Sequence, residues 1–169
     1  HWALVASFAI AYFSTFGVTQ EVHDWSGYTA IALVIARCVW GFVGSKHARF
    51  ADFVPTVRGL WKYVGALIRG HEPRYIGHNP AGAVMILFLL AMVTAIGMTG
   101  WMLTLDAFWG SETVEDVHAA LVNITLIAVA VHVCAAIYES WKHRENLVWS
   151  MVVGTKRTND ADPAAPVAH

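Results

Sequence analysis

Residues 117–138 read VHAALVNITLIAVAVHVCAAIY, a run of 22 residues that is nearly all apolar and carries two histidines. At ~1.5 Å per residue, a helix of this length crosses a ~30 Å hydrocarbon core. His118 and His132 are 14 residues apart. This is about 40° short of four helical turns, so both rings leave one face, roughly 21 Å apart along the axis. Because ionisable side chains inside a membrane are costly and usually functional, the stretch predicts a transmembrane helix with two stacked metal sites.

The composition of the whole chain agrees with a membrane protein. Of its 169 residues, 57% are hydrophobic and 14% are charged, and the mean hydropathy is +0.50. A soluble domain is nearer ~45–50% apolar and ~25% charged. The length fits one domain, and the chain begins without Met, so we expect further residues before His1.

Three more apolar runs accompany the first, at residues 2–18, 25–44 and 81–105. Each is long enough to span the hydrocarbon core, and short connections join antiparallel neighbours. We therefore expect an all-α fold, an up-down bundle of four transmembrane helices over residues 1–157. The polar tail at 158–169 is too poor in apolar residues to fold by itself.

The charges divide the bundle into two sides. Ten of the 11 Lys and Arg lie in the loop at 45–80 or after the fourth apolar run, and Arg37 lies in the half of its span nearest that side. The short connections at 19–24 and 106–116 are acidic. The positive-inside rule then places both termini and the loop at 45–80 in the cytoplasm. Residues 55–69 follow the helical apolar pattern with basic residues off the stripe, which predicts an interfacial amphipathic helix.

Depth sorts four of the nine histidines into two pairs. His23 and His118 lie at the outer ends of their spans, and His1 and His132 lie toward the cytoplasm. An iron porphyrin between helices takes one imidazole on each face, and small residues near the ligands leave it room. These are Gly27, Ala119, Ala120, Ala128, Ala135 and Ala136. Zinc is a rival metal, but its usual three or four protein ligands do not fit two pairs ~20 Å apart.

Other residues have weaker claims to a role. Structural roles are favoured for His47, His71, His78 and His143, although each could stand near a quinone or a haem propionate. Arg37 is the only basic residue within a span, and a propionate and snorkelling toward the cytoplasm are equally good accounts of it. Cys38 and Cys134 stand alone in apolar runs, and no CxxCH is present, which excludes covalent haem attachment to this chain.

The chain resembles the bacterial cytochrome b561 family, which includes the b-type cytochrome subunits of nickel-iron hydrogenases. The pieces that carry the resemblance are HW (1–2), HDWSG (23–27), RCVWGFVGSKHARFADF (37–53), GHNPAG (77–82), EDVHAAL (115–121), VHVCAAIYE (131–139) and ENLVWSMVVGTKR (145–157). The resemblance implies a four-helix bundle with two noncovalent b haems, ligated by His1, His23, His118 and His132. It also implies electron transfer between the membrane quinone pool and a redox partner outside the membrane.

Three functions remain open from the sequence. The first is an electron-transfer subunit that works with a periplasmic c-type cytochrome, a hydrogenase or a similar dehydrogenase. The second is a stand-alone quinone-linked oxidoreductase such as a superoxide oxidase, and the third is a membrane scaffold or transporter whose histidines are structural. Outer carboxylates at Glu112, Glu115 and Asp116 either steer a basic partner or stabilise a helix N-terminus. No nucleophile–base pair, phosphate loop or nucleic-acid footprint is found, so we expect neither hydrolase activity nor nucleic-acid binding.

Overall fold

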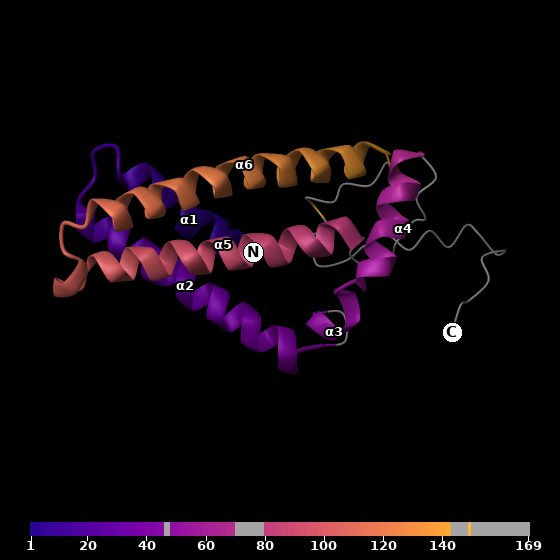
Figure 1. Ribbon diagram of the computed structural model, residues 1–169, viewed down its shortest axis with the longest axis horizontal. Coiled ribbons are helices and arrows are strands. Elements are labelled where there is room, and N and C mark those ends of the chain that lie inside the picture. The colour runs from indigo at the N-terminus through magenta and orange to yellow at the C-terminus, as the bar shows by residue number, and fades with distance from the viewer. Residues whose placement is uncertain (46–47, 70–79, 143–148, 150–169) are drawn as a thin grey trace. The chain divides into compact units, whose positions relative to one another are not determined.

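The computed structural model describes residues 1–45, 48–69, 80–142 and 149, and every regular element in these residues is helical (Figure 1). The elements are α1 (Trp2–Ser14), α2 (Gln20–Val43), α3 (Phe50–Phe53), α4 (Val57–Ile68), α5 (Pro80–Leu103), the 3-10 turn η1 (Asp106–Phe108) and α6 (Glu112–Lys142). The all-α prediction is confirmed for the described part of the chain.

The chain divides into two compact units, His1–Val129 and Ala130–His169. The first unit contains α1 to α5, η1 and the N-terminal part of α6. The second begins within α6 and includes its remaining turns to Lys142. The up-down four-helix bundle therefore stays a prediction, because it concerns both units.

In the part of the chain that the structure describes, three helices are long and apolar enough to cross a membrane, namely α2, α5 and α6. The helix α6 is 31 residues long and begins at Glu112, so the last residues of the predicted outer loop belong to it. In contrast, α1 has 13 residues, fewer than the predicted run at 2–18. It ends early because the chain turns after Ser14, where Gly17 adopts a φ of 132° that favours glycine. At ~1.5 Å per residue α1 is about 20 Å long, which is shorter than the hydrocarbon core.

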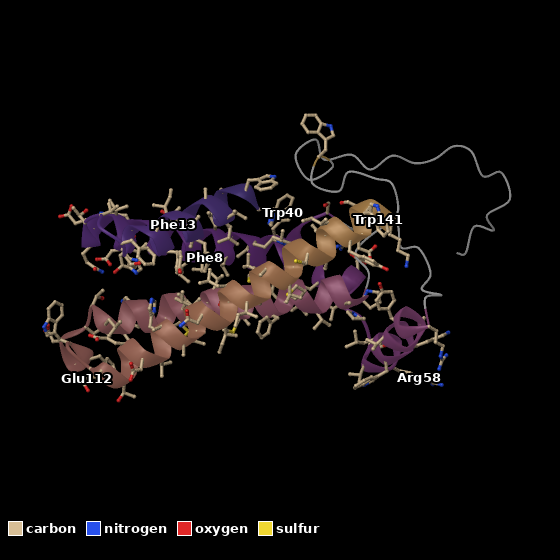
Figure 2. All side chains as sticks on the ribbon, turned by 90° about the horizontal axis from the view of Figure 1, so that it is seen from above. Phe8, Phe13, Trp40, Arg58, Glu112 and Trp141 are labelled. Carbon is tan, nitrogen blue, oxygen red and sulfur yellow. The ribbon has the colours of Figure 1, made fainter. Side chains whose placement is uncertain are left out.

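The core of the first unit is small and lies where α1 packs on α2 and α2 packs on α5. Ala30, Val34 and Val93 are buried there, and partly buried side chains surround them. Phe8 points from α1 toward this core, whereas Phe13 on the same helix is exposed (Figure 2). Many large apolar side chains are likewise exposed, as expected for helices surrounded by lipid.

Two glycines permit close approach to the helix α2. A Cβ atom at Gly97 of α5 would overlap the Ile31 side chain of α2. A Cβ atom at Gly41 of α2 would overlap the ring of Phe50 in α3. The Phe50 ring also packs edge-on to Phe42 at 5.4 Å and lies 5.3 Å from the Arg37 guanidinium carbon. The short helix α3, which the sequence analysis missed, thus covers the end of α2 through one aromatic ring.

A helix does form in the basic loop, and it is α4. It contacts α5, and its most buried side chain is Tyr63, at 3% exposure. The apolar stripe predicted for this helix includes Val57, Leu60, Trp61 and Val64. Leu60 and Val64 are half-buried, whereas Val57 and Trp61 are exposed. Among the side chains that the structure describes in α4, the predicted stripe is thus partly buried, and the interfacial amphipathic helix stays a prediction.

We expect Gly97→Ala to destabilise the first unit. The new methyl group displaces Ile31 from the contact between α2 and α5. Such overpacking costs about 1–3 kcal/mol, and over most of this range the cost exceeds a helix-propensity gain of about 1 kcal/mol. Thermal unfolding of the detergent-purified chain, followed by circular dichroism, measures the loss. Gly65→Ala in α4 is the control, because its Cβ would meet nothing within 4 Å. Equal midpoints for the two variants would contradict the close contact at Gly97.

Candidate functional site

The first unit brings together two of the predicted ligands, His23 of α2 and His118 of α6. Their ring centroids lie 6.3 Å apart, with an angle of 66° between the ring planes. His23 lies in the first turns of α2, and His118 lies in the second turn of α6. The structure thus brings these two residues close together, and their role as ligands of one haem stays a prediction.

A backbone carbonyl of α1 fixes the His23 ring. The Nδ1 atom lies 2.8 Å from the Ala11 oxygen, which can only accept a hydrogen bond. Nδ1 must therefore carry a proton, and Nε2 keeps the lone pair of the neutral ring. The Ser14 hydroxyl donates to the same carbonyl at 2.7 Å. The contact orients His23 and leaves Nε2 as the nitrogen that a metal could bind.

A hydroxyl of α5 fixes the His118 ring in a similar way. Its Nδ1 atom lies 2.9 Å from Thr99 Oγ1. The Thr99 oxygen is also 3.0 Å from the Ala95 carbonyl and 2.9 Å from the Ile96 carbonyl. Since the hydroxyl has one proton and both carbonyls only accept, donation to α5 leaves its lone pair for Nδ1–H of His118. Nε2 is again the atom available to a metal.

The spacing of the two rings fits one metal between them. A metal–imidazole bond is about 2 Å, and the nitrogen lies about 1.1 Å from the ring centre by ordinary bond lengths. Two imidazoles on opposite sides of one metal then have centroids about 6 Å apart, close to the observed 6.3 Å. Within the described residues, no three His, Cys, Asp or Glu side chains gather into a cluster suited to zinc. His23 and His118 would thus suit a haem, to which each ring would offer one nitrogen.

Glycines lie beside both rings. A Cβ atom at Gly27, one turn after His23, would meet nothing within 4 Å. A Cβ atom at Gly100 of α5 would lie 3.2 Å from Cε1 of His118, tighter than ordinary contact. Gly27 thus leaves open space on the face of α2 that carries His23, and Gly100 lets α5 approach the second ring.

The second predicted pair is not brought together within one unit. His1 is exposed at the N-cap of α1, with its ring edge-on to Trp2 at 5.3 Å. His132 is partly buried and belongs to the second unit. The pairing of His1 with His132 therefore stays a prediction. The same holds for a haem propionate at Arg37, whose guanidinium lies over Phe50.

Several predictions concern residues outside the described part of the chain. These are His47, His71, His78, His143, most of the GHNPAG piece, the ENLVWSMVVGTKR piece apart from Trp149, and the tail at 158–169.

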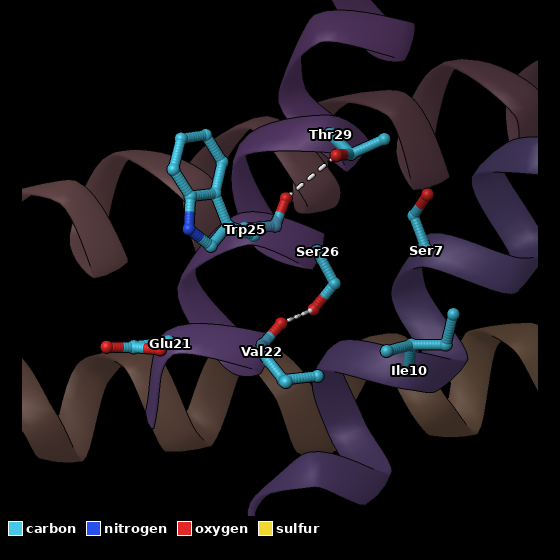
Figure 3. Close-up of a pocket in the computed structure, with 7 residues that line it drawn as sticks. All are labelled: Ser7, Ile10, Glu21, Val22, Trp25, Ser26 and Thr29. Carbon is cyan, nitrogen blue, oxygen red and sulfur yellow. Dashed lines mark hydrogen bonds between the residues drawn. The ribbon is translucent and has the colours of Figure 1, made fainter. Parts of the chain in front are cut away.

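A pocket of about 410 Å³ lies between α1 and α2 (Figure 3). Its lining includes Ser7, Glu21 and Trp25 but neither His23 nor any other predicted ligand. The hydroxyls of Ser7, Ser26 and Thr29 donate to carbonyls of their own helices. The pocket is therefore a gap beside the contact of two helices, separate from the histidine pair.

Glu112 and Glu115 lie in the first turn of α6. Carboxylates at this position interact favourably with the helix dipole. Stabilisation of the helix N-terminus is one of the two roles considered above for these carboxylates, the other being attraction of a basic partner. The structure places both side chains in the turn where the helix dipole acts.

Comparison with known proteins identifies a family of similar sequences. A family model described as prokaryotic cytochrome b561 matches residues 1–154. A probable Ni/Fe-hydrogenase B-type cytochrome subunit of Azotobacter vinelandii is 28% identical, over 87% of this chain and 72% of its own length. The protein of the same description from Rhodobacter capsulatus is 27% identical, over 85% of this chain and 64% of its own length. No solved structure matches the chain significantly.

Sequence reasoning missed three contributors to the site, namely Ala11, Thr99 and Gly100. Ala11 acts through its carbonyl, which every residue type possesses, so its sequence carries no signal. Thr99 and Gly100 do carry a signal, because residues 97–101 (GMTGW) place a hydroxyl between two glycines within an apolar span. Such residues at helix interfaces in membranes permit close approach and hydrogen bonding.

We expect Gly100→Val to displace the His118 ring and reduce haem bound at this pair. The branched side chain would enter the space within 3.2 Å of Cε1, and the ring cannot move without losing the Thr99 contact. The ratio of haem absorbance to protein absorbance in the purified chain measures the effect. Met98→Val, at an exposed position of the same helix, should retain full haem content. An unchanged ratio and spectrum in Gly100→Val would contradict the site geometry.

Proposed function

Because the chain belongs to the prokaryotic cytochrome b561 family, we propose that it carries electrons across the membrane through two bis-histidine haems. As a member of this family it is a membrane b-type cytochrome that transfers electrons. The observation that supports the proposal most strongly is the His23–His118 pair, with centroids 6.3 Å apart and each Nδ1 held by a neighbouring helix.

The proposed ligands form an outer and an inner site. His23 and His118 hold the outer haem, and His1 and His132 hold the inner one. When bound, haem iron supplies reversible one-electron transfer. The chain's residues supply axial nitrogens, burial and hydrogen bonds to the ligands. Arg37 is proposed to pair with a propionate of the inner haem, since it lies in the half of α2 nearer the basic side.

The proposed electron donors and acceptors lie at the two ends of this path. We propose a quinone as the membrane partner and a hydrogenase, a similar dehydrogenase or a c-type cytochrome as the periplasmic one. The hydrogenase is supported by the description of the relatives as hydrogenase cytochrome subunits. The excess of Lys and Arg on one side supports an orientation in the bacterial inner membrane with both termini in the cytoplasm.

His118→Ala should remove the outer haem and leave the inner one. The substitution deletes one axial nitrogen, and His23 alone leaves the iron with an open position on one face. Redox titration of the purified chain, followed at the haem absorbance, should change from two components to one, with about half of the haem retained. Loss of both components, or of neither, would contradict the pairing by depth.

His132→Ala should produce the complementary result, in which the inner component disappears and the outer one keeps its potential. Asn123→Ala is the matched control, because Asn123 is an exposed polar residue between the two histidines on α6. This variant should retain both components. A His132→Ala protein with the full haem content would show that His1 and His132 do not share a haem.

A further inference from the structure

Thr99 stands out among the hydroxyl residues of α5. The Thr94 hydroxyl, at an exposed position, donates to the Leu90 carbonyl of its own helix, and Thr104 donates to the Trp101 carbonyl. Thr99 has such local acceptors as well, but its oxygen also lies 2.9 Å from Nδ1 of His118 on α6. This side chain therefore joins a helix that carries no proposed ligand to a ring that carries one.

The proton count sets the direction of this contact. An imidazole that binds iron through Nε2 must carry its proton on Nδ1. The Thr99 oxygen then accepts that proton, and its own proton goes to a carbonyl of α5, either that of Ala95 or that of Ile96. The result is a chain of two hydrogen bonds from the ring to the α5 backbone, which holds the ring plane as well as the tautomer.

We propose that Thr99 is a positioning residue that orients His118 and lowers the reduction potential of the haem bound by His23 and His118. This inference rests on the proposed function. An acceptor at Nδ1–H increases the basicity of the ligating nitrogen. A more basic ligand stabilises ferric iron relative to ferrous iron, so the potential falls.

The two rings of the pair have different acceptors. His23 donates to the Ala11 carbonyl, which no side-chain substitution removes, whereas His118 donates to a side chain. Thr99 is thus the position at which a single substitution changes the hydrogen bond of one axial ligand and leaves both ligands in place. Gly100 lies against the same ring, since a Cβ atom there would come within 3.2 Å of Cε1, and the Ile96 carbonyl is a second acceptor beside the ring.

The test compares Thr99→Val, Thr99→Ser and Thr94→Val with the unmodified full chain in detergent. Valine keeps the branched shape and removes the acceptor, serine keeps the hydroxyl, and Thr94→Val removes a hydroxyl that bonds only its own helix. Haem per chain, the midpoint potential of each redox component and the electron paramagnetic resonance spectrum of the oxidised haems are measured for each variant.

We expect Thr99→Val to shift the potential of one component upward and to change its ferric spectrum, because ring orientation determines that signal. Thr99→Ser should restore both properties, and Thr94→Val should match the unmodified chain. Selective loss of the same component from Thr99→Val, with Thr99→Ser retaining it, also supports the role. An unchanged potential and spectrum in Thr99→Val, or equal effects of serine and valine, would overturn it. Absence of haem from the unmodified chain would instead reject the proposed function.

Discussion

Two imidazoles can share one metal only if each presents a lone pair to it, and an acceptor for each Nδ1 proton fixes the tautomer that leaves this lone pair on Nε2. In the first unit α1 supplies one acceptor through the Ala11 carbonyl, and α5 supplies the other through the Thr99 hydroxyl. The rings themselves come from α2 and α6. Two helices therefore carry the rings and two others supply their hydrogen-bond acceptors. The packing of α1 on α2 and the close approach of α5 at Gly100 both affect the orientation of these rings.

The surroundings of this pair suit a membrane. Three helices are long and apolar enough to span the bilayer, and many of their large side chains are exposed. The short helix α1 is an exception, since it covers only part of that thickness. It still contributes to the site, because the Ala11 carbonyl lies near its C-terminal end. In a low-dielectric membrane a hydrogen bond is electrostatically stronger than in water. The Ala11 carbonyl and the Thr99 hydroxyl therefore hold the rings of His23 and His118 more firmly there.

The sequence predicted the long apolar helices and the closeness of His23 and His118, because both depend on strong local patterns. Apolar runs of span length identify α2, α5 and α6, and the depth of His23 and His118 follows from the order of the runs. The end of α1 and the helix α3 were not predicted, because they depend on a glycine turn and on the contacts of the Phe50 ring. Ala11 and Thr99 were missed because their roles depend on which helix lies beside which ring. The His1–His132 pair involves both units and stays a prediction.

The central claim is that this chain holds haem b between histidines, and the most direct measurement is haem b per chain in the purified protein with near-infrared magnetic circular dichroism of the oxidised form. The pyridine–haem spectrum counts the haems, and the near-infrared charge-transfer band identifies the axial ligands. Two haems per chain, both with bis-histidine ligation, are the predicted result. A chain without haem, or haem with an axial ligand other than histidine at the outer site, would contradict the account.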